Sequence, residues 1–176
     1  MYPVRIVRAG PERIPDLEPL WLALCAHHAS VAPQLGPLRA PADSWRRRSA
    51  NYHRWLREPD AFAFIAEEPA GPVGYALVHF RDGSETWQSA DRVAELETLS
   101  VLPDARNSGI GKALLDAVRA ELGRLAPTEL WLAAVTTNTD ALRFYERHAF
   151  IPVTMALRQV LARDEQESQK TATRES

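Results

Sequence analysis

The sequence predicts an α/β sandwich, in which helices pack against a mixed β-sheet. Short apolar runs rich in β-forming residues alternate with segments whose apolar residues recur at helical spacing. A strand–helix–strand order over residues 93–135 adds a crossover between parallel strands, which we expect to be right-handed. The chain has 176 residues and is 45% apolar, which fits one packed domain.

The N-terminal region predicts a strand, a helix and a loop. Residues 4–8 alternate as a short strand does, and Gly10 with Pro11 ends the run. Helical spacing then predicts a first helix over about residues 17–29. The prolines and glycine of residues 31–42 exclude a helix there.

A second helix and a hairpin are expected next. Asp43 or Ser44 caps the helix, which ends at Glu58 before a proline. Residues 61–66 and 73–80 are apolar runs joined by a turn-forming segment, so they predict a β-hairpin. The second run offers no polar face over most of its length, which indicates a strand covered on both sides.

The second half of the chain continues the alternation of strands and helices. We expect a central strand over residues 93–101, a helix over 110–125 and a buried strand over 130–135. A short helix over residues 140–148 and a strand or hairpin over 150–161 follow.

Residues 162–176 carry mixed charges and no apolar side chain larger than alanine. Such a segment cannot bury enough surface to become ordered, so we expect a flexible C-terminal tail. The single domain is therefore expected to span residues 1–161.

Composition argues against several kinds of partner. The net charge of −2 is spread over mixed acidic and basic residues, so we expect no nucleic-acid partner. No apolar run approaches the ~20 residues of a membrane span, so we expect no membrane association. Cys25 is the only cysteine, which excludes an internal disulfide and is compatible with a reducing compartment; we interpret it as a buried helical residue rather than a nucleophile. The N-terminus lacks the apolar region of a signal peptide, so we expect a cytoplasmic protein. We expect no metal.

The stretch from Arg106 to Gly111 is expected to cradle a phosphate or pyrophosphate. It follows the central strand and opens an apolar helix, whose first amides and dipole attract an anion. A P-loop would need glycine at Arg106 and Ser or Thr at Ala113, and a dinucleotide fingerprint would need a third glycine at Leu114. Neither pattern is present.

The remaining pattern, R-x-x-G-x-G after a strand, resembles motif A of the GNAT superfamily of N-acetyltransferases, which holds the pyrophosphate of acetyl-CoA. A second pattern, N-x-x-A-x-x-F-Y-x-x-x-x-F, resembles motif B of the same family. It is formed here by Asn138, Ala141, Phe144, Tyr145 and Phe150. Together the two motifs and the element order cover about residues 62–161. The resemblance implies a GNAT-like mixed, mostly antiparallel sheet of about six to seven strands flanked by about four helices.

The resemblance also implies acetyl-CoA as co-substrate and leaves a homodimer possible. The strands at residues 93–101 and 130–135 would splay apart, and the pantetheine arm would bond to the exposed backbone between them. The implied cofactor-binding residues are Leu99, Ser100, Val101, Arg106, Asn107, Ser108, Gly109, Ile110, Gly111, Lys112, Asn138, Ala141, Phe144 and Tyr145.

Acetyl transfer to an amine needs a base, because an alkylamine has a pKa of about 10.4. Glu95 and Glu97 stand two apart on an apolar strand, so both point to one face unless a bulge intervenes. We expect Glu97, ahead of Glu95, to act as the base through a water molecule. The alternative is that both carboxylates lie on a solvated surface near a strand end.

Three further roles follow from the resemblance. Tyr145 is the expected general acid for the departing thiolate, and its alternative role is core packing against Phe144. The amide of Leu99 or Ser100 is expected to stabilise the oxyanion if the strand is bulged there. Asn138 is expected at the CoA arm, as a helix cap, or as both.

Aromatic residues near the segment that lines the acceptor pocket in the family either form that pocket or pack on the sheet; these are His27, His28, Trp45, Tyr52 and Trp55. Ala149 departs from the family pattern, which usually has glycine before the aromatic residue that matches Phe150. Alanine in a left-handed turn costs about 1 kcal/mol, so the helix end is expected to differ in shape.

The leading hypothesis is an acetyl-CoA-dependent N-acetyltransferase, in which a primary amine of a small molecule or peptide attacks the thioester directly. The alternative is a noncatalytic acyl-CoA-binding or sensing module that has lost its base and acid. Glu97 and Tyr145 are both present, which favours the enzyme. A hydrolase is disfavoured, because no G-x-S-x-G elbow occurs.

Overall fold

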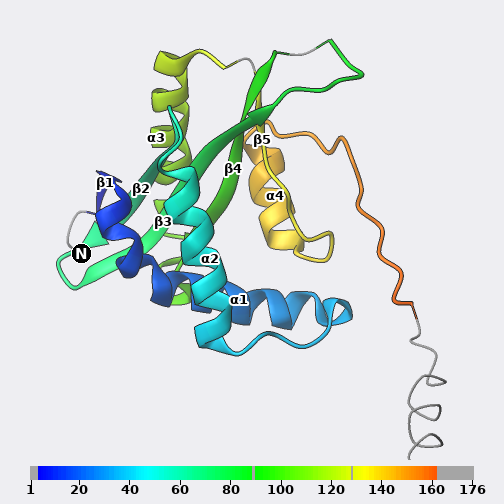
Figure 1. The fold of residues 1–176 in the computed structure, drawn as a ribbon. Helices are drawn as coiled ribbons and strands as arrows, with labels where there is room; N and C mark the ends of the chain where they lie inside the picture. The colour runs from blue at the N-terminus through cyan, green and yellow to red at the C-terminus, as the bar shows by residue number, and fades with distance from the viewer. Residues whose placement is uncertain (1–3, 89, 128, 162–176) are drawn as a thin grey trace, which may run out of the picture. The chain divides into compact units, whose positions relative to one another are not determined.

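The computed structural model describes residues 4–88, 90–127 and 129–161, so the predicted tail at 162–176 lies outside the described residues. The described strands form one sheet in the order β1-β2-β3-β4-β5 (Figure 1). Strands β1 to β4 pair antiparallel, and β5 pairs parallel with β4. The mixed, mostly antiparallel sheet is confirmed, with five strands in place of the expected six to seven.

Contacts group the chain into a larger unit that ends at Leu142 and a smaller unit that begins at Arg143. The elements, in chain order, are β1 Arg5–Ala9, the 3-10 helix η1 Pro11–Leu17, α1 Glu18–Val31, η2 Pro33–Leu35, α2 Pro41–Trp55, β2 Phe62–Glu68, β3 Gly71–Asp82, β4 Arg92–Val101, η3 Pro103–Ala105, α3 Ile110–Leu125, β5 Leu130–Trp131 and α4 Thr139–Arg147.

Helix α2 begins earlier than the sequence pattern suggested. Its N-cap is Ala40 and Pro41 occupies the first turn, so the expected cap at Asp43 or Ser44 is wrong. Proline suits this position because its fixed φ is already helical and its missing N–H would have had no intrahelical acceptor. Asp43 instead lies in the first turn, where its carboxylate accepts a hydrogen bond from Arg47 at 3.0 Å.

Helices cover both faces of the sheet in the larger unit. The hydroxyl of Ser100 in β4 donates to the carbonyl of Leu20 in α1 at 3.3 Å. On the other side, a Cβ placed on Gly74 of β3 would lie 3.3 Å from both Leu114 of α3 and Val101 of β4. Consecutive residues of a strand point to opposite faces, so α1 and α3 lie on opposite sides of β4. Strand β3 is buried from Gly74 to His79, which confirms a strand covered on both sides.

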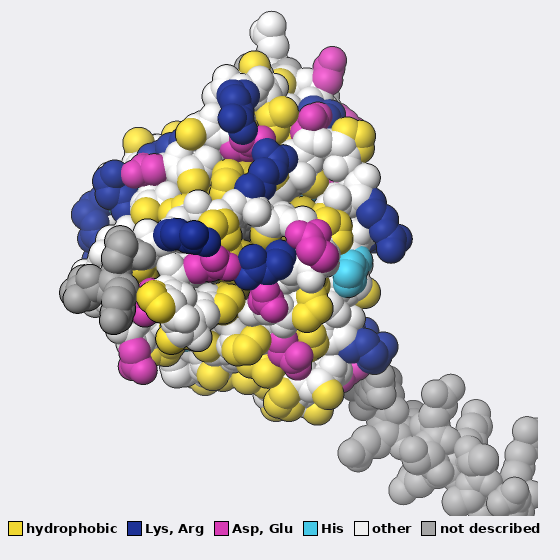
Figure 2. Space-filling view, turned by 90° about the vertical axis from the view of Figure 1, so that its left-hand side faces the viewer, with side chains coloured by type: hydrophobic (Ala, Val, Ile, Leu, Met, Phe, Trp, Pro, Cys, Tyr) yellow, Lys and Arg dark blue, Asp and Glu magenta, His cyan; other side chains and the backbone are white. Residues whose placement is uncertain are grey.

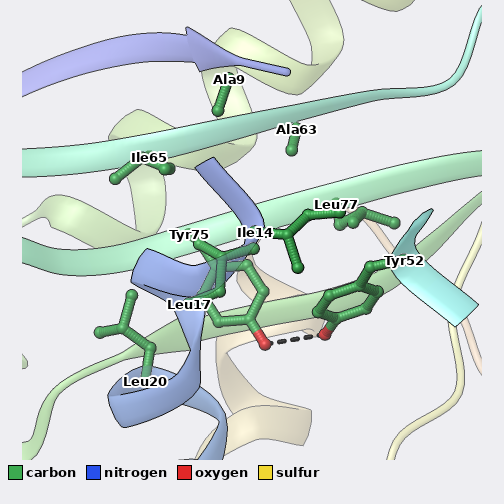
Figure 3. Packing of buried hydrophobic residues seen from close by; sticks show 9 residues of the cluster. All are labelled: Ala9, Ile14, Leu17, Leu20, Tyr52, Ala63, Ile65, Tyr75 and Leu77. Atoms are coloured by element: carbon green, nitrogen blue, oxygen red, sulfur yellow. Dashed lines mark hydrogen bonds between the residues drawn. The ribbon is translucent and has the colours of Figure 1, made fainter. Parts of the chain in front are cut away.

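Between the sheet and the N-terminal helices lies an apolar core (Figure 3). Its members come from β1, η1, α1, α2, β2 and β3, and they are Ala9, Ile14, Leu17, Leu20, Tyr52, Ala63, Ile65, Tyr75 and Leu77. The hydroxyl of Tyr52 lies 2.8 Å from that of Tyr75 and 2.8 Å from Thr98 Oγ1. The polar atoms carried into this core by the two tyrosines therefore satisfy one another.

Two expected strands are shorter or absent. Only Leu130 and Trp131 form β5, and none of residues 132–135 is buried, so the expected buried strand over 130–135 is wrong in length and burial. Residues 150–161 contain no regular element, so the expected strand or hairpin there is also wrong. The apolar side chains of this segment are exposed, as with Ile151 at 77% and Leu157 at 90%. Alternating apolar residues predict a strand only where a neighbouring strand supplies hydrogen bonds, and no described strand does so here.

The C-terminal end of α4, in the smaller unit, keeps its shape without glycine. Ala149 has φ +64°, and its amide donates to the carbonyl of Glu146 at 3.0 Å. The amide of Phe150 donates to the carbonyl of Tyr145 at 3.1 Å, and the two rings meet edge to face at 5.5 Å. This is a Schellman motif with its hydrophobic contact. The expectation that Ala149 changes the shape of the helix end is therefore wrong.

The face drawn in Figure 2 carries basic and acidic side chains interspersed, without a continuous field of one sign. Among the ion pairs of the larger unit, Arg13 bonds both Asp16 at 2.5 Å and Glu67 at 2.6 Å. None of the helices in the described part of the chain has the length and apolar character that a bilayer crossing requires. Across the same residues, no three His, Cys, Asp or Glu side chains gather in a group that could hold a metal ion.

Candidate active site

Strand β4 is irregular at Glu97. Thr98 pairs with Leu77 of β3 and Leu96 pairs with Val78, so Glu97 stands between them without an opposite residue. Such a bulge lets two consecutive side chains point to the same side of the sheet. The contacts agree, because both Glu97 and Thr98 reach α2.

The Glu97 carboxylate lies between the guanidinium of Arg48 and the imidazole of His79. Arg48 of α2 donates to Oε1, and His79 Nε2 of β3 lies 3.4 Å from Oε2. Burial raises the pKa of Glu97, but the hydrogen bonds from His79 and Arg48 outweigh burial, so this pKa lies below its ordinary value. The structure thus brings together one carboxylate, one guanidinium and one imidazole.

His79 lies flat against an aromatic ring. Its ring is parallel to that of Trp55 within 3°, with the centroids 4.4 Å apart. Burial lowers the pKa of His79, but hydrogen bonds to Glu97 and to the carbonyl of Phe80 outweigh burial, so the pKa is raised. Arg48 is positioned similarly, 4.1 Å above the ring of Trp21.

Glu95, the second predicted carboxylate, has a different partner. Its Oε2 accepts a hydrogen bond from Arg81 Nε at 2.6 Å, and it pairs with His79 across the β3–β4 ladder. Both glutamates are partly exposed, so neither is a buried, unpaired charge. Glu97 is the one whose carboxylate contacts both an arginine and a histidine.

The loop from β4 leads into the N-terminus of α3 through a left-handed turn. Gly109 caps α3 with φ +87°, a conformation that favours glycine, and Asn107 also has positive φ, at 60°. The first helical hydrogen bond runs from the amide of Ala113 to the carbonyl of Gly109, so the amides of Ile110 and Gly111 precede it. These amides and the helix dipole could hold an anion.

Side chains of this loop bond mainly to the protein itself. Arg106 Nε donates to the carbonyl of Val101 at 3.2 Å, and Ser108 donates to the carbonyl of Ala105 at 2.5 Å. Lys112 lies one turn from Asp116 and bonds its carboxylate at 2.5 Å. Backbone amides are therefore the groups most free to take up a phosphate.

The end of β4 is open on one side. Strand β5 pairs only with Ala94 and Glu95, so no described strand lies along residues 96–101 on that side. Leu99 and Ser100 pair regularly with β3, and the bulge lies at Glu97. The bulge at Leu99 or Ser100, on which their expected oxyanion role depended, is absent. The unpaired edge of β4 would instead offer their backbone, with that of Val101, to a ligand.

Asn138 is buried and caps α4. Its Oδ1 accepts a hydrogen bond from the amide of Ala141 at 3.3 Å. This satisfies one of the free amides at the helix start, so the expected capping role of Asn138 is confirmed.

In the smaller unit, Phe144 and Tyr145 belong to an aromatic cluster. Their centroids are 5.4 Å apart, and Tyr145 also meets the ring of Phe150. Burial raises the pKa of the Tyr145 phenol to about 12, so the hydroxyl stays protonated at neutral pH. Both a donor role and a packing role remain compatible with this environment.

The structure places three of the aromatic residues near the α1–α2 segment in the core or against it. Tyr52 is fully buried in the core, and Trp45 packs against that core. Trp55 stacks on His79 and so lies beside Glu97.

The sulfur of Cys25 lies 3.7 Å from the hydroxyl of Ser44, and burial raises the pKa of the Cys25 thiol. A raised thiol pKa argues against a nucleophile.

Sequence reasoning missed Arg48 and His79. His79 stands in an otherwise apolar run, which is a signal for a polar residue with a specific partner. Arg48, Tyr52 and Trp55 share one helical face by spacing, but three consecutive arginines at 46–48 concealed which one points inward.

The chain is similar to several known acetyltransferases. N-alpha-acetyltransferase 60 of Xenopus tropicalis is 31% identical in an alignment of 138 positions that covers 71% of this chain and 57% of that protein. Mycothiol acetyltransferase of Geodermatophilus obscurus is 36% identical over 149 residues, covering 84% of this chain and 44% of that one. The chain thus spans about half the length of these relatives.

A solved aminoglycoside N-acetyltransferase in complex with CoA has the same fold, with a TM-score of 0.63 over 94% of this chain and 97% of that one, at 18% identity. The profile of the Acetyltransferase (GNAT) family matches residues 28–150, which is more than half of the chain. The chain therefore belongs to the Acetyltransferase (GNAT) family.

Proposed function

We propose that this chain transfers an acetyl group from acetyl-CoA to a primary amine of a small molecule or a peptide. The observation that carries the proposal is the course of β4, which places a partly exposed carboxylate at a bulge and then leads through the Gly109 turn into the open N-terminus of α3. The candidate base thus lies on β4, and the candidate anion site lies at the start of α3, which directly follows that strand in the chain.

The proposed cofactor site is assigned in parts. The backbone of residues 107–112, with Arg106, takes the pyrophosphate, and the edge of β4 at Leu99, Ser100 and Val101 bonds the pantetheine arm. Asn138 and Ala141 at the start of α4, and Phe144 with Tyr145 further along it, are assigned to the CoA arm. The family relationship and the free amides of α3 support this assignment.

The proposed chemistry is direct attack on the thioester. The amine nitrogen bonds to the acetyl carbon while Glu97, directly or through water, takes its proton. Glu95 is the second choice, because an arginine bonds each carboxylate but Glu97 alone also has a hydrogen-bond contact with a histidine. The carbon–sulfur bond then breaks, and Tyr145 donates to the leaving thiolate. A phenol with pKa about 12 donates a hydrogen bond to a thiolate more readily than it gives up its proton, because a thiol has a pKa of about 8.5.

Other parts of the proposal concern the protein as a whole. We propose that residues 1–161 act as one acetyltransferase domain, and that it works in the cytoplasm, where its single cysteine, Cys25, would stay reduced. A homodimer remains a proposal taken from the family. The similar proteins support an amine acceptor, since one is an N-alpha-acetyltransferase and another is an aminoglycoside N-acetyltransferase.

The test is release of free CoA thiol from acetyl-CoA with a panel of small-molecule and peptide amines, beside calorimetric titration of CoA. Thiol release that depends on an amine, with an acetylated product found by mass spectrometry, is the expected result. Saturable CoA binding without turnover on any amine would contradict the enzyme and favour a noncatalytic CoA-binding module. No CoA binding would contradict both.

A further inference from the structure

Glu97 alone is a weak base in the setting that the structure gives it. One carboxylate oxygen accepts from Arg48 and the other faces His79 at 3.4 Å. Arg48, and His79 whenever its Nε2 carries a proton, favour the charged carboxylate, so the pKa of Glu97 lies below its ordinary value. General-base catalysis works best when the acceptor has a pKa near the working pH. A second group that can hold the proton would remove this difficulty.

Both ring nitrogens of His79 face oxygen atoms. Nδ1 lies 3.4 Å from the carbonyl oxygen of Phe80, and Nε2 lies 3.4 Å from Oε2 of Glu97. A neutral imidazole carries a proton on one nitrogen only, whereas an imidazolium donates from both. In the neutral ring one nitrogen lone pair therefore points at an oxygen, and a single added proton turns that contact into a hydrogen bond.

The surroundings of His79 also suit a positive ring. The parallel ring of Trp55, 4.4 Å away, presents its face, which attracts a cation. Glu95 of β4 pairs with His79 across the ladder, and its negative charge also raises the pKa of His79. Arg81 of β3, which bonds Glu95, and Arg48 of α2 oppose the charge. The hydrogen bonds to oxygen prevail over burial, and the pKa of His79 is raised.

We propose that His79 and Glu97 form one proton-accepting pair, in which Glu97 removes the proton from the acceptor amine and His79 holds it. The nitrogen–hydrogen bond of the amine breaks as its nitrogen bonds to the acetyl carbon. The proton reaches Oε2 of Glu97 and passes to the lone pair of His79 Nε2. The imidazolium later returns this proton to water, so the pair is unchanged over a cycle.

This proposal rests on the proposed N-acetyltransferase function and deepens it. His79 acts through Glu97 and does not touch the amine, so it is a positioning residue rather than a catalytic one. Because the two groups share one proton, the base titrates with an apparent pKa that belongs to the pair. The active form has neutral His79 and charged Glu97, and activity is lost as the pH falls and His79 takes up a proton.

The first test is the substitution His79→Gln, which keeps a donor to Glu97 but cannot accept a proton. The turnover number at neutral pH is expected to fall by about tenfold or more, while KM for acetyl-CoA stays unchanged. The acidic limb of the pH–rate profile should move to lower pH, since Glu97 alone has the lower pKa. His53→Gln, on α2, is the matched control and should leave both unchanged.

The second test follows the His79 ring by NMR in protein labelled at histidine. The wild type should titrate above the ordinary histidine pKa, and Glu97→Gln should lower that pKa, because the substitution removes the oxygen charge that Nε2 faces. An unchanged pH–rate profile in His79→Gln, or a His79 titration that Glu97→Gln does not move, would overturn the proposal. The NMR titration does not require turnover, so the two proposals can fail separately. If only the proposed function is wrong, no amine is acetylated but Glu97→Gln still lowers the pKa of His79. If only this inference is wrong, an amine is acetylated but Glu97→Gln leaves the pKa of His79 unchanged.

Discussion

At the scale of single residues, hydroxyl groups meet in the core where α2 faces the sheet. Tyr52 bonds Tyr75 and Thr98, each at 2.8 Å, and Tyr52 is fully buried. Tyr52→Phe keeps the ring but leaves buried hydroxyls with fewer partners, so the free energy of unfolding should fall by about 1–3 kcal/mol, measured by urea unfolding. Tyr75→Phe is the matched control with the smaller expected loss, because Tyr52 then keeps Thr98. Equal stability of wild type and Tyr52→Phe would show that the network contributes nothing.

Tyr145 separates a chemical role from a packing role. Tyr145→Phe keeps the edge-to-face contact with Phe150 but removes the hydroxyl, whose pKa is about 12. A donor to the thiolate predicts a fall in kcat of at least about tenfold with unchanged melting temperature and acetyl-CoA binding. The loss should shrink for acyl donors with a more acidic thiol, which leaves without help. An unchanged kcat under conditions where chemistry limits the rate would mark Tyr145 as a packing residue.

At the scale of elements, the end of α4 stores backbone strain that glycine would release. Ala149 holds φ +64° inside a complete Schellman motif. Glycine there removes about 1–2 kcal/mol of strain and costs about 0.4–1 kcal/mol through the freer unfolded chain. Ala149→Gly should therefore stabilise the protein by roughly 0.5–1 kcal/mol, read as a higher melting temperature.

The matched control for that change lies within α3. Ala120 is exposed in the helix interior, so Ala120→Gly should destabilise the protein by about 1 kcal/mol. A loss of stability in Ala149→Gly equal to that of Ala120→Gly would contradict the left-handed conformation at Ala149.

The start of α3 carries the prediction for the anion site. Gly111→Val fills space beside the free amides and Arg106→Glu adds a negative charge, so each should raise KM for acetyl-CoA more than KM for the amine. Gly123 lies on the same helix with open space around it, and Gly123→Ala should leave both KM values unchanged. Steady-state kinetics with each substrate varied will measure this, and an unchanged KM for acetyl-CoA in both site variants would remove the phosphate assignment.

Local sequence patterns predicted most elements but not their partners. The hairpin of β2 and β3 and the apolar face of α3 followed from alternation and helical spacing, which depend on neighbouring residues only. Residues 150–161 carry the same alternation, yet they form no strand, because pairing needs a neighbour that the pattern does not specify.

In the candidate site, too, local patterns predicted some residues, whereas contacts between distant elements decided the others. Glu97 and the Gly109 turn could be found from motif spacing, whereas the roles of Arg48 and His79 depend on α2 and β3 meeting at Glu97. The bulge at Glu97 was also unpredictable in position, since it is a property of register between two strands.

At the scale of the whole molecule, the buried core is formed by residues that precede position 165. The predicted polar tail offers no apolar surface, so deleting these residues should leave the melting temperature and activity nearly unchanged. Differential scanning calorimetry of the truncated chain measures this. A drop of several degrees would show that the segment docks, either on its own chain or on a second copy.

The central claim is that Glu97, at the bulge of β4, is the base of an N-acetyltransferase, and the pH dependence of the Glu97→Gln variant tests it most directly. The account predicts a kcat well below wild type at neutral pH, by about a hundredfold or more, and recovery at higher pH, where the amine loses its proton without help. Glu95→Gln, whose carboxylate is bonded to Arg81, serves as the comparison and should lose less. A Glu97→Gln variant as active as wild type at neutral pH, or a loss confined to Glu95→Gln, would contradict the account.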